Sequence, residues 1–100
     1  HLILTYMIKQ NMELAVYDTY AFSKKGDIIH FDVLLPSGEN KEKALIYANT
    51  FLKKISEEGA SLKIDRCNYC HIESAKPSVK KLVEADGHYI LQMEGCPNPK

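Results

Sequence analysis

The chain has 100 residues, 45% of them hydrophobic, and its 13 basic and 13 acidic side chains give no net charge at neutral pH. This length corresponds to one domain. The charge balance lacks the basic footprint of nucleic-acid-binding proteins and gives no attraction to an anionic membrane surface. No apolar run approaches the roughly 20 residues of a transmembrane helix. We therefore expect no nucleic-acid partner and no membrane association, and we leave homo-oligomerisation open.

The three cysteines are an odd number, too few for a disulfide-stabilised secreted scaffold. Residues 1–11 are apolar, but they lack the basic start and the cleavage site of a signal peptide. We therefore predict a reducing, cytoplasmic location. We interpret residues 1–11 as an N-terminal extension, residues 12–96 as a single domain, and residues 97–100 as a frayed tail.

Two strands and a tight turn are predicted at the start of this domain. Residues 13–20 are rich in β-branched and aromatic types, and residues 28–35 form a second apolar run. Between them, residues 23–27 are polar and include a glycine. So short a connection favours an antiparallel hairpin. On the second strand, one face is predicted to form core, and it carries Ile29, Phe31, Val33 and Leu35.

The clearest helix is predicted over residues 40–57. Its apolar side chains recur with a period of 3.6 residues, at Ala44, Leu45, Ala48, Phe51, Leu52 and Ile55. Asn40 is a favourable N-cap, and Gly59 is suited to the position after the helix. This stripe is typical of ordinary core packing.

The second half of the domain contains two more strands and a short helix. Residues 62–66 alternate between apolar and charged types, and the strand can continue, bent, to residue 74. A helix is predicted from Pro77 to its end at Gly87, followed by a last strand over residues 88–94. The order β-β-α-β-α-β predicts an α/β domain of the two-layer α+β type, a mixed four-stranded sheet covered by two helices. Strand–helix–strand crossovers should contribute parallel pairs.

The densest group of reactive side chains lies at residues 67–73, which include a Cys-x-x-Cys-His sequence. This spacing is typical of c-type haem attachment, of part of a zinc site, or of a redox dithiol. Haem attachment needs export and usually a helical pocket, and the sequence indicates neither, so we predict no haem. A redox dithiol usually begins a helix, whereas the next predicted helix starts at Pro77.

A zinc site is the second possibility for these cysteines. Four sulfur or nitrogen ligands are required, and the candidates are Cys67, Cys70, His71 and Cys96, with His30 as an alternative. If the last two strands run parallel, Cys67 and Cys96 should lie at the same edge of the sheet, and Cys96 should lie near the Cys67–Cys70 turn. The alternative interpretation is that reduced cysteines are packed as small apolar side chains.

A second candidate site is polar. On the predicted strand 28–35, His30 and Asp32 share the face opposite the core, and Asp18 of the neighbouring strand can lie beside them. With two residues from the cysteine segment, the candidate cluster is Asp18, His30, Asp32, His71 and Glu73. A half-solvated polar face is the ordinary explanation of such a pattern. A small site built on rigid strands is the functional one.

Several of these segments resemble a known family. The resemblance rests on Val16–Tyr20, on His30–Asp32, on Cys67–Glu73 with its Cys-x-x-Cys-His-Ile-Glu sequence, and on Tyr89–Cys96. In this order they look like a small bacterial family classed as a domain of unknown function, DUF2024. The resemblance covers residues 12–96. It implies a compact α/β domain and assigns no activity, cofactor or catalytic residue.

Three functions are compatible with this sequence. The first is a non-catalytic binding or interaction module. The second is zinc binding at the cysteines. The third is thiol redox or a minor enzymatic activity of the polar cluster. Glycine-rich phosphate-binding loops and the nucleophile elbow of hydrolases are absent from the sequence, so we assign no catalytic residue.

Overall fold

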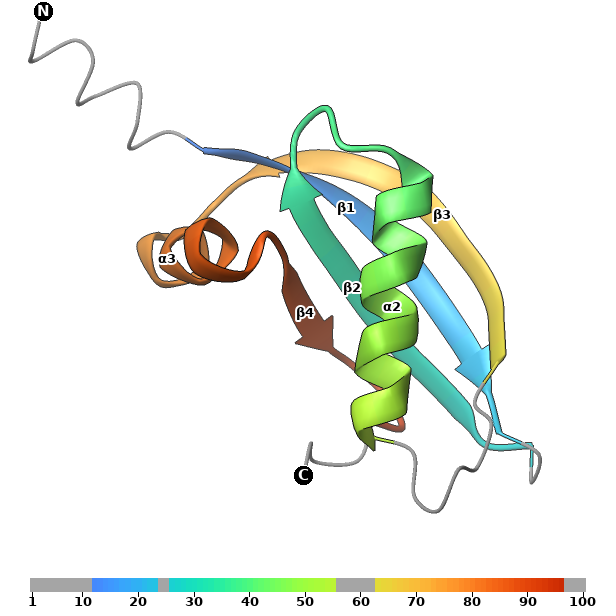
Figure 1. Cartoon of the computed structure of the whole chain (residues 1–100). Helices are drawn as coiled ribbons and strands as arrows, with labels where there is room; N and C mark the ends of the chain where they lie inside the picture. Colours follow the sequence, from blue (N-terminus) through green and yellow to red (C-terminus); the bar gives the residue numbers. More distant parts are fainter. Residues whose placement is uncertain (1–11, 24–25, 56–62, 97–100) are drawn as a thin grey trace, which may run out of the picture.

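A computed structural model describes residues 12–23, 26–55 and 63–96 of the chain. Its elements are β1 (Glu13–Phe22), β2 (Ile28–Pro36), α2 (Lys41–Ile55), β3 (Lys63–Ser74), α3 (Pro77–Asp86) and β4 (Tyr89–Gln92). The predicted α+β class and the order β-β-α-β-α-β are confirmed (Figure 1). The predictions for residues 1–11, for Gly59 and for residues 97–100 lie outside the described residues.

The four strands form one sheet in the order β3-β1-β2-β4, and every neighbouring pair is antiparallel. The expected parallel pairs are therefore wrong. The α2 crossover does join two strands that run in the same direction, but β1 lies between them (Figure 1). After the tight hairpin forms, β1 and β2 each have one free edge; the chain that returns from α2 pairs with β1, and the edge of β2 is left for β4. The α3 connection then leads from β3 at one edge to β4 at the other.

Both faces of the sheet are covered in part by a helix. On one face, α2 packs over β1 and β2 through the apolar stripe predicted from the sequence. The predicted core face of β2 is buried there, with Phe31 fully inaccessible. On the opposite face, Val83 of α3 packs against Leu14, Val16 and Leu34. Since α3 covers only the end of that face where β1 begins, the remainder of the face is left to polar side chains.

Local interactions fix the start of α2 and the end of α3 as predicted. The side chain of Asn40 accepts a hydrogen bond from the backbone N–H of Lys43, at 3.0 Å, which caps α2. Gly87 ends α3 in the left-handed conformation, with φ of 82°, and its N–H donates to the carbonyl of Val83. The left-handed backbone is what favours glycine at this position, because the nearest atom to an added Cβ is the hydroxyl at the end of the Tyr47 side chain, which can move away.

The cysteine segment lies inside a strand, not in a turn. β3 runs without interruption through Cys67 and Cys70 to Ser74, which agrees with the bent continuation considered above. Its pairing with β1 shifts twice. Tyr69 and His71 oppose consecutive β1 residues, which leaves Cys70 as an extra residue, and Ile64 and Arg66 leave Asp65 in the same way. Such β-bulges bend a strand and increase its twist.

Candidate functional site

The polar residues of the second candidate site gather on the face of the sheet that α3 covers only in part. The register across the strands explains this arrangement. Asp18 of β1 lies opposite Asp32 of β2 and opposite Asn68 of β3, and its neighbour Tyr20 lies opposite His30 and Arg66. The hairpin therefore brings Asp18, His30 and Asp32 together, with one ligand atom from each within 4.8 Å of the others.

His30 and Asp18 form the closest contact in this cluster. Nε2 of His30 lies 2.5 Å from Oδ1 of Asp18, so a proton on Nε2 is donated to the carboxylate. The imidazole also stacks on the ring of Tyr20, with ring centroids 4.2 Å apart. The guanidinium of Arg66 lies over the same Tyr20 ring, 4.5 Å from its centre, in a cation–π contact. The stack holds the imidazole plane parallel to the Tyr20 ring.

Asp32 is the buried member of the cluster, with 9% of its surface exposed. Burial, the neighbouring charge of Asp18 and a hydrogen bond with that carboxyl together raise the pKa of Asp32 from 3.8 to about 6, against an opposing contribution from His30. Asp32 therefore keeps its proton to a higher pH than an exposed aspartate.

The two remaining residues of the predicted cluster lie on the same face but further away. His71 and Glu73 of β3 are both about half exposed, and their side chains approach to 3.6 Å. They are not part of the three-residue group that lies within 4.8 Å. The charge of Glu73 nevertheless contributes to the raised pKa of Asp32. Of the five predicted residues, the structure therefore brings Asp18, His30 and Asp32 together, and His71 and Glu73 lie outside this group on the same face.

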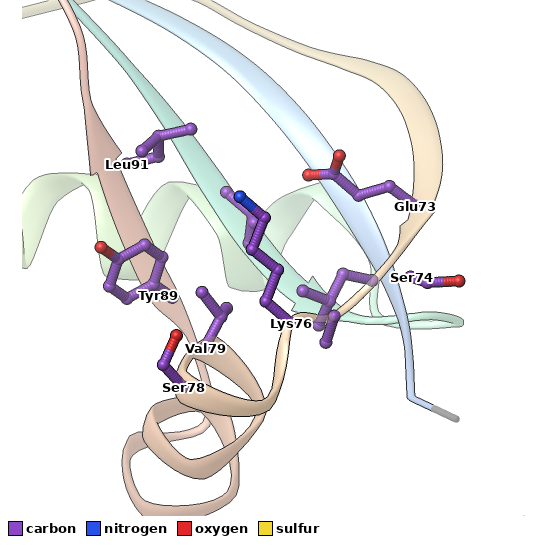
Figure 2. Close-up of a pocket in the computed structure, with 10 residues that line it drawn as sticks. Glu73, Ser74, Lys76, Ser78, Val79, Tyr89 and Leu91 are labelled. Atoms are coloured by element: carbon purple, nitrogen blue, oxygen red, sulfur yellow. The ribbon is translucent and has the colours of Figure 1, made fainter. Parts of the chain in front are cut away.

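A pocket of about 370 Å³ adjoins the cluster on this face. Its lining combines apolar side chains with a few polar ones: Leu14, Leu34, Glu73, Ser74, Ala75, Lys76, Ser78, Val79, Tyr89 and Leu91. Leu91 lies directly opposite Asp32 in the β2–β4 register, which makes the pocket and the cluster neighbours. Figure 2 shows the side chain of Lys76 extended over the sheet, between Leu91 and Glu73. This volume is in the range of small-molecule sites.

The cysteines are not assembled into a metal site within the described part of the chain. Cys67 is buried on the α2 face, whereas His71 pairs with Val16 and belongs to the opposite face. Cys70 is exposed, and Cys96 follows β4 at the far edge of the sheet. The prediction that Cys67 and Cys96 share an edge is wrong, because it relied on parallel strands. Cys96 packs instead against the core cluster that contains Cys67.

The environment of the buried thiols disfavours thiolate chemistry. Burial raises the pKa of Cys67, against an opposing contribution from the Thr19 hydroxyl 3.4 Å from its sulfur. Burial likewise raises the pKa of Cys96, whose thiol donates to the carbonyl of His30 at 3.4 Å. Zinc ligation and disulfide exchange both need the thiolate. Packing as small apolar side chains therefore explains these two residues.

The raised pKa of Asp32 makes the stability of the metal-free protein depend on pH. The folded carboxyl titrates near 6 and the unfolded one near 3.8, so the folded state holds the extra proton between these values. Stability from this group is present below pH 4 and is lost as the pH rises to 6. We expect Asp32→Asn to raise the free energy of unfolding by about 1–3 kcal/mol at pH 7.5 relative to its effect at pH 4. Urea unfolding at both pH values, with chelator present, measures the difference. An equal effect at both values would contradict it.

This fold and this face define a small α+β domain with a histidine–carboxylate cluster beside a pocket. The chain belongs to the family described as Domain of unknown function (DUF2024), whose family model matches residues 12–93. It is similar to the NMR structure of protein NE1680 from Nitrosomonas europaea, with 38% identity and a TM-score of 0.71. The match covers 86% of this chain and 100% of that one. No curated protein matches the chain. No described helix is long and apolar enough to cross a membrane.

Sequence reasoning missed the contact of Arg66 with the Tyr20 ring and the position of Lys76 beside the pocket. Arg66 and Tyr20 are ordinary strand residues until the β1–β3 register is known, and that register contains two bulges. Lys76 precedes Pro77, which begins α3, and only the position of α3 turns this lysine toward the sheet. The Lys-Pro pair at a helix start was the one local signal for this placement.

Proposed function

We propose that this domain is a non-catalytic binding module that holds a divalent metal ion at Asp18, His30 and Asp32. The observation that supports the proposal is the approach of one ligand atom from each of these residues to within 4.8 Å. Two carboxylates and one imidazole suit Mn²⁺, Fe²⁺ and Zn²⁺. Water molecules would complete the coordination, because these three side chains supply fewer ligands than such ions usually take.

Electrostatics supports the same assignment. A doubly charged ion would offset the burial and the Asp18 charge that raise the pKa of Asp32, and so favour the ionised carboxylate. Binding must therefore release protons and weaken as the pH falls below about 6. The Tyr20 ring stacked on His30 holds the imidazole in one orientation, which reduces the entropy lost on binding.

Isothermal titration of the protein with Mn²⁺ tests this function. Mn²⁺ prefers oxygen and imidazole ligands over thiols, so it separates the polar cluster from the cysteines. We expect one site per chain, with affinity reduced at least about tenfold in Asp32→Asn and in His30→Asn, because each removes one of three ligands. Measured in two buffers of different ionisation enthalpy, the binding heats should differ by the number of protons released multiplied by the difference between the two ionisation enthalpies.

Matched variants complete the design. Asp86→Asn removes an exposed carboxylate at the end of α3 and should leave the affinity unchanged. Cys96→Ser and Cys70→Ser test the cysteine alternative in a parallel titration with Zn²⁺. Zinc affinity that is lost in the cysteine variants and retained in Asp32→Asn would place the ion on the thiols. Absence of Mn²⁺ binding at millimolar concentration would refute the proposal.

A further inference from the structure

The outer edge of β3 is the longest backbone edge that the described part of the chain leaves unpaired. β3 spans Lys63–Ser74 and pairs on one side with β1, and no described strand follows it in the sheet order (Figure 1). The opposite edge, β4, has four residues. An open edge of this length is a template for another strand unless charges or bulges prevent the pairing.

Hydrogen bonds at the ends of β1 identify the backbone groups that face outward. The Glu13 carbonyl accepts from Ser37, beyond β2, and the Met12 carbonyl accepts from Ala75, beyond β3. Along an antiparallel strand such bonds alternate, so odd-numbered β1 residues bond to β2 and even-numbered ones to β3. The β3 residues opposite odd-numbered β1 residues therefore turn their N–H and C=O groups to the outer edge. They are Ile64, Cys67, Tyr69, Ile72 and, at the end of the strand, Ser74.

The four outward residues from Ile64 to Ile72 are symmetric about Asn68, and Ser74 lies beyond them. Because one bulge adds Asp65 and the other adds Cys70, the set is spaced by three, two and three residues along the chain. Two copies of β3 placed antiparallel with Asn68 opposite Asn68 therefore match outward groups with outward groups. Cys67 then faces Tyr69 of the second copy, and Ile64 faces Ile72. The two bulges oppose each other, so they do not block the pairing.

The side chains complement each other in the same register. Tyr69 and Ile72 are 54% and 46% exposed, unusual values for large apolar residues on a strand, and Ile64 of the second copy lies opposite Ile72. Asp65, 3.4 Å from Arg66 of its own chain, lies opposite His71 of the other copy, which is 3.6 Å from Glu73, and this arrangement occurs twice because the contact is two-fold. Cross-strand pairs of these kinds stabilise antiparallel sheets.

We propose that the edge of β3 is a homodimer interface, in which two chains join their sheets through antiparallel β3–β3 pairing centred on Asn68. The partner is a second copy of this chain because the register is self-complementary in backbone, in apolar side chains and in charge. The interface lies at the edge of the sheet, and the metal cluster on one face does not contribute to it. The proposal therefore stands independently of the proposed function.

Sedimentation velocity of the full chain across micromolar to millimolar concentrations tests this interface. We expect a reversible species of twice the mass of one chain. Asp65→Lys removes the carboxylate opposite His71 at both ends of the contact, and it places like charges opposite each other when His71 carries a proton, so the dimer should dissociate roughly tenfold more readily. Adding His71→Glu in the same chain restores opposite charges and should recover dimerisation. Asp86→Lys, an exposed change on α3, should have no effect.

A backbone variant provides the second arm. Tyr69→Pro removes an N–H that faces outward and no bond to β1, so circular dichroism should show a folded chain that sediments as a monomer. Should this variant unfold, the charge exchange decides alone. A chain that stays monomeric at millimolar concentration, or a dimer that neither Asp65→Lys nor its compensating partner affects, would overturn the assignment and leave the edge to a different occupant.

Discussion

Replacing Phe31 with alanine is expected to lower the free energy of unfolding by about 3–5 kcal/mol. The ring is fully buried in the centre of β2, and its centroid lies 4.7 Å from that of Phe51 on α2. The change removes the main contact between the sheet and the helix and leaves a cavity under α2. Chemical denaturation followed by circular dichroism measures the loss.

The chain offers a matched control for this change. Phe22, at the end of β1, is 37% exposed, so Phe22→Ala should cost no more than about 1 kcal/mol. Phe31→Leu keeps most of the buried volume and should fall between the two. Equal losses in Phe31→Ala and Phe22→Ala would show that the core is not where the structure places it.

Gly95→Ala is expected to destabilise the domain by at least about 2 kcal/mol, for two separable reasons. Gly95 has φ of 74°, which a side chain disfavours, and a Cβ there would overlap the carbonyl oxygen of Ile28. The strand segment that follows β4 bonds to His30 at this point, so the backbone cannot retreat without breaking that pairing. Thermal and urea unfolding should both report the change.

Gly26→Ala separates the two reasons. Gly26 has a similar φ of 86°, but no atom lies within 4 Å of an added Cβ. Its substitution should therefore cost the backbone strain alone, about 1–2 kcal/mol. If the two variants were equally stable, the close approach of Gly95 to Ile28 would have no energetic importance.

The local predictions from sequence were confirmed where a residue's neighbours along the chain determine its environment. The alternation along residues 28–35 placed Phe31 in the core and His30 on the other face, as the burial shows. The Asn40 cap and the Gly87 end of α3 follow from side-chain and backbone preferences within one turn. Such features need no knowledge of the distant chain.

Part of the candidate site could be predicted from the sequence for the same reason. His30 and Asp32 are two residues apart on one strand, and the tight turn placed Asp18 on the adjacent one, so three members were named correctly as neighbours. The cysteine prediction failed because it depended on the relative direction and order of two strands joined by α3. The hairpin has two free edges, one on β1 and one on β2, and the local sequence does not indicate which of them each later strand joins.

The position of β1 between β2 and β3 has a consequence for the newly synthesised chain. β1 and β2 can pair as soon as the hairpin leaves the ribosome, but the other side of β1 has no partner until residues 63–74 are made. While α2 is being synthesised, β1 therefore has an unpaired backbone edge, and its apolar side chains Leu14 and Val16 are not yet covered by α3. Such exposed segments are substrates for chaperones and starting points of aggregation. The fold therefore depends on a late, distant segment to protect its earliest one, and its folding should be slower than its small size suggests.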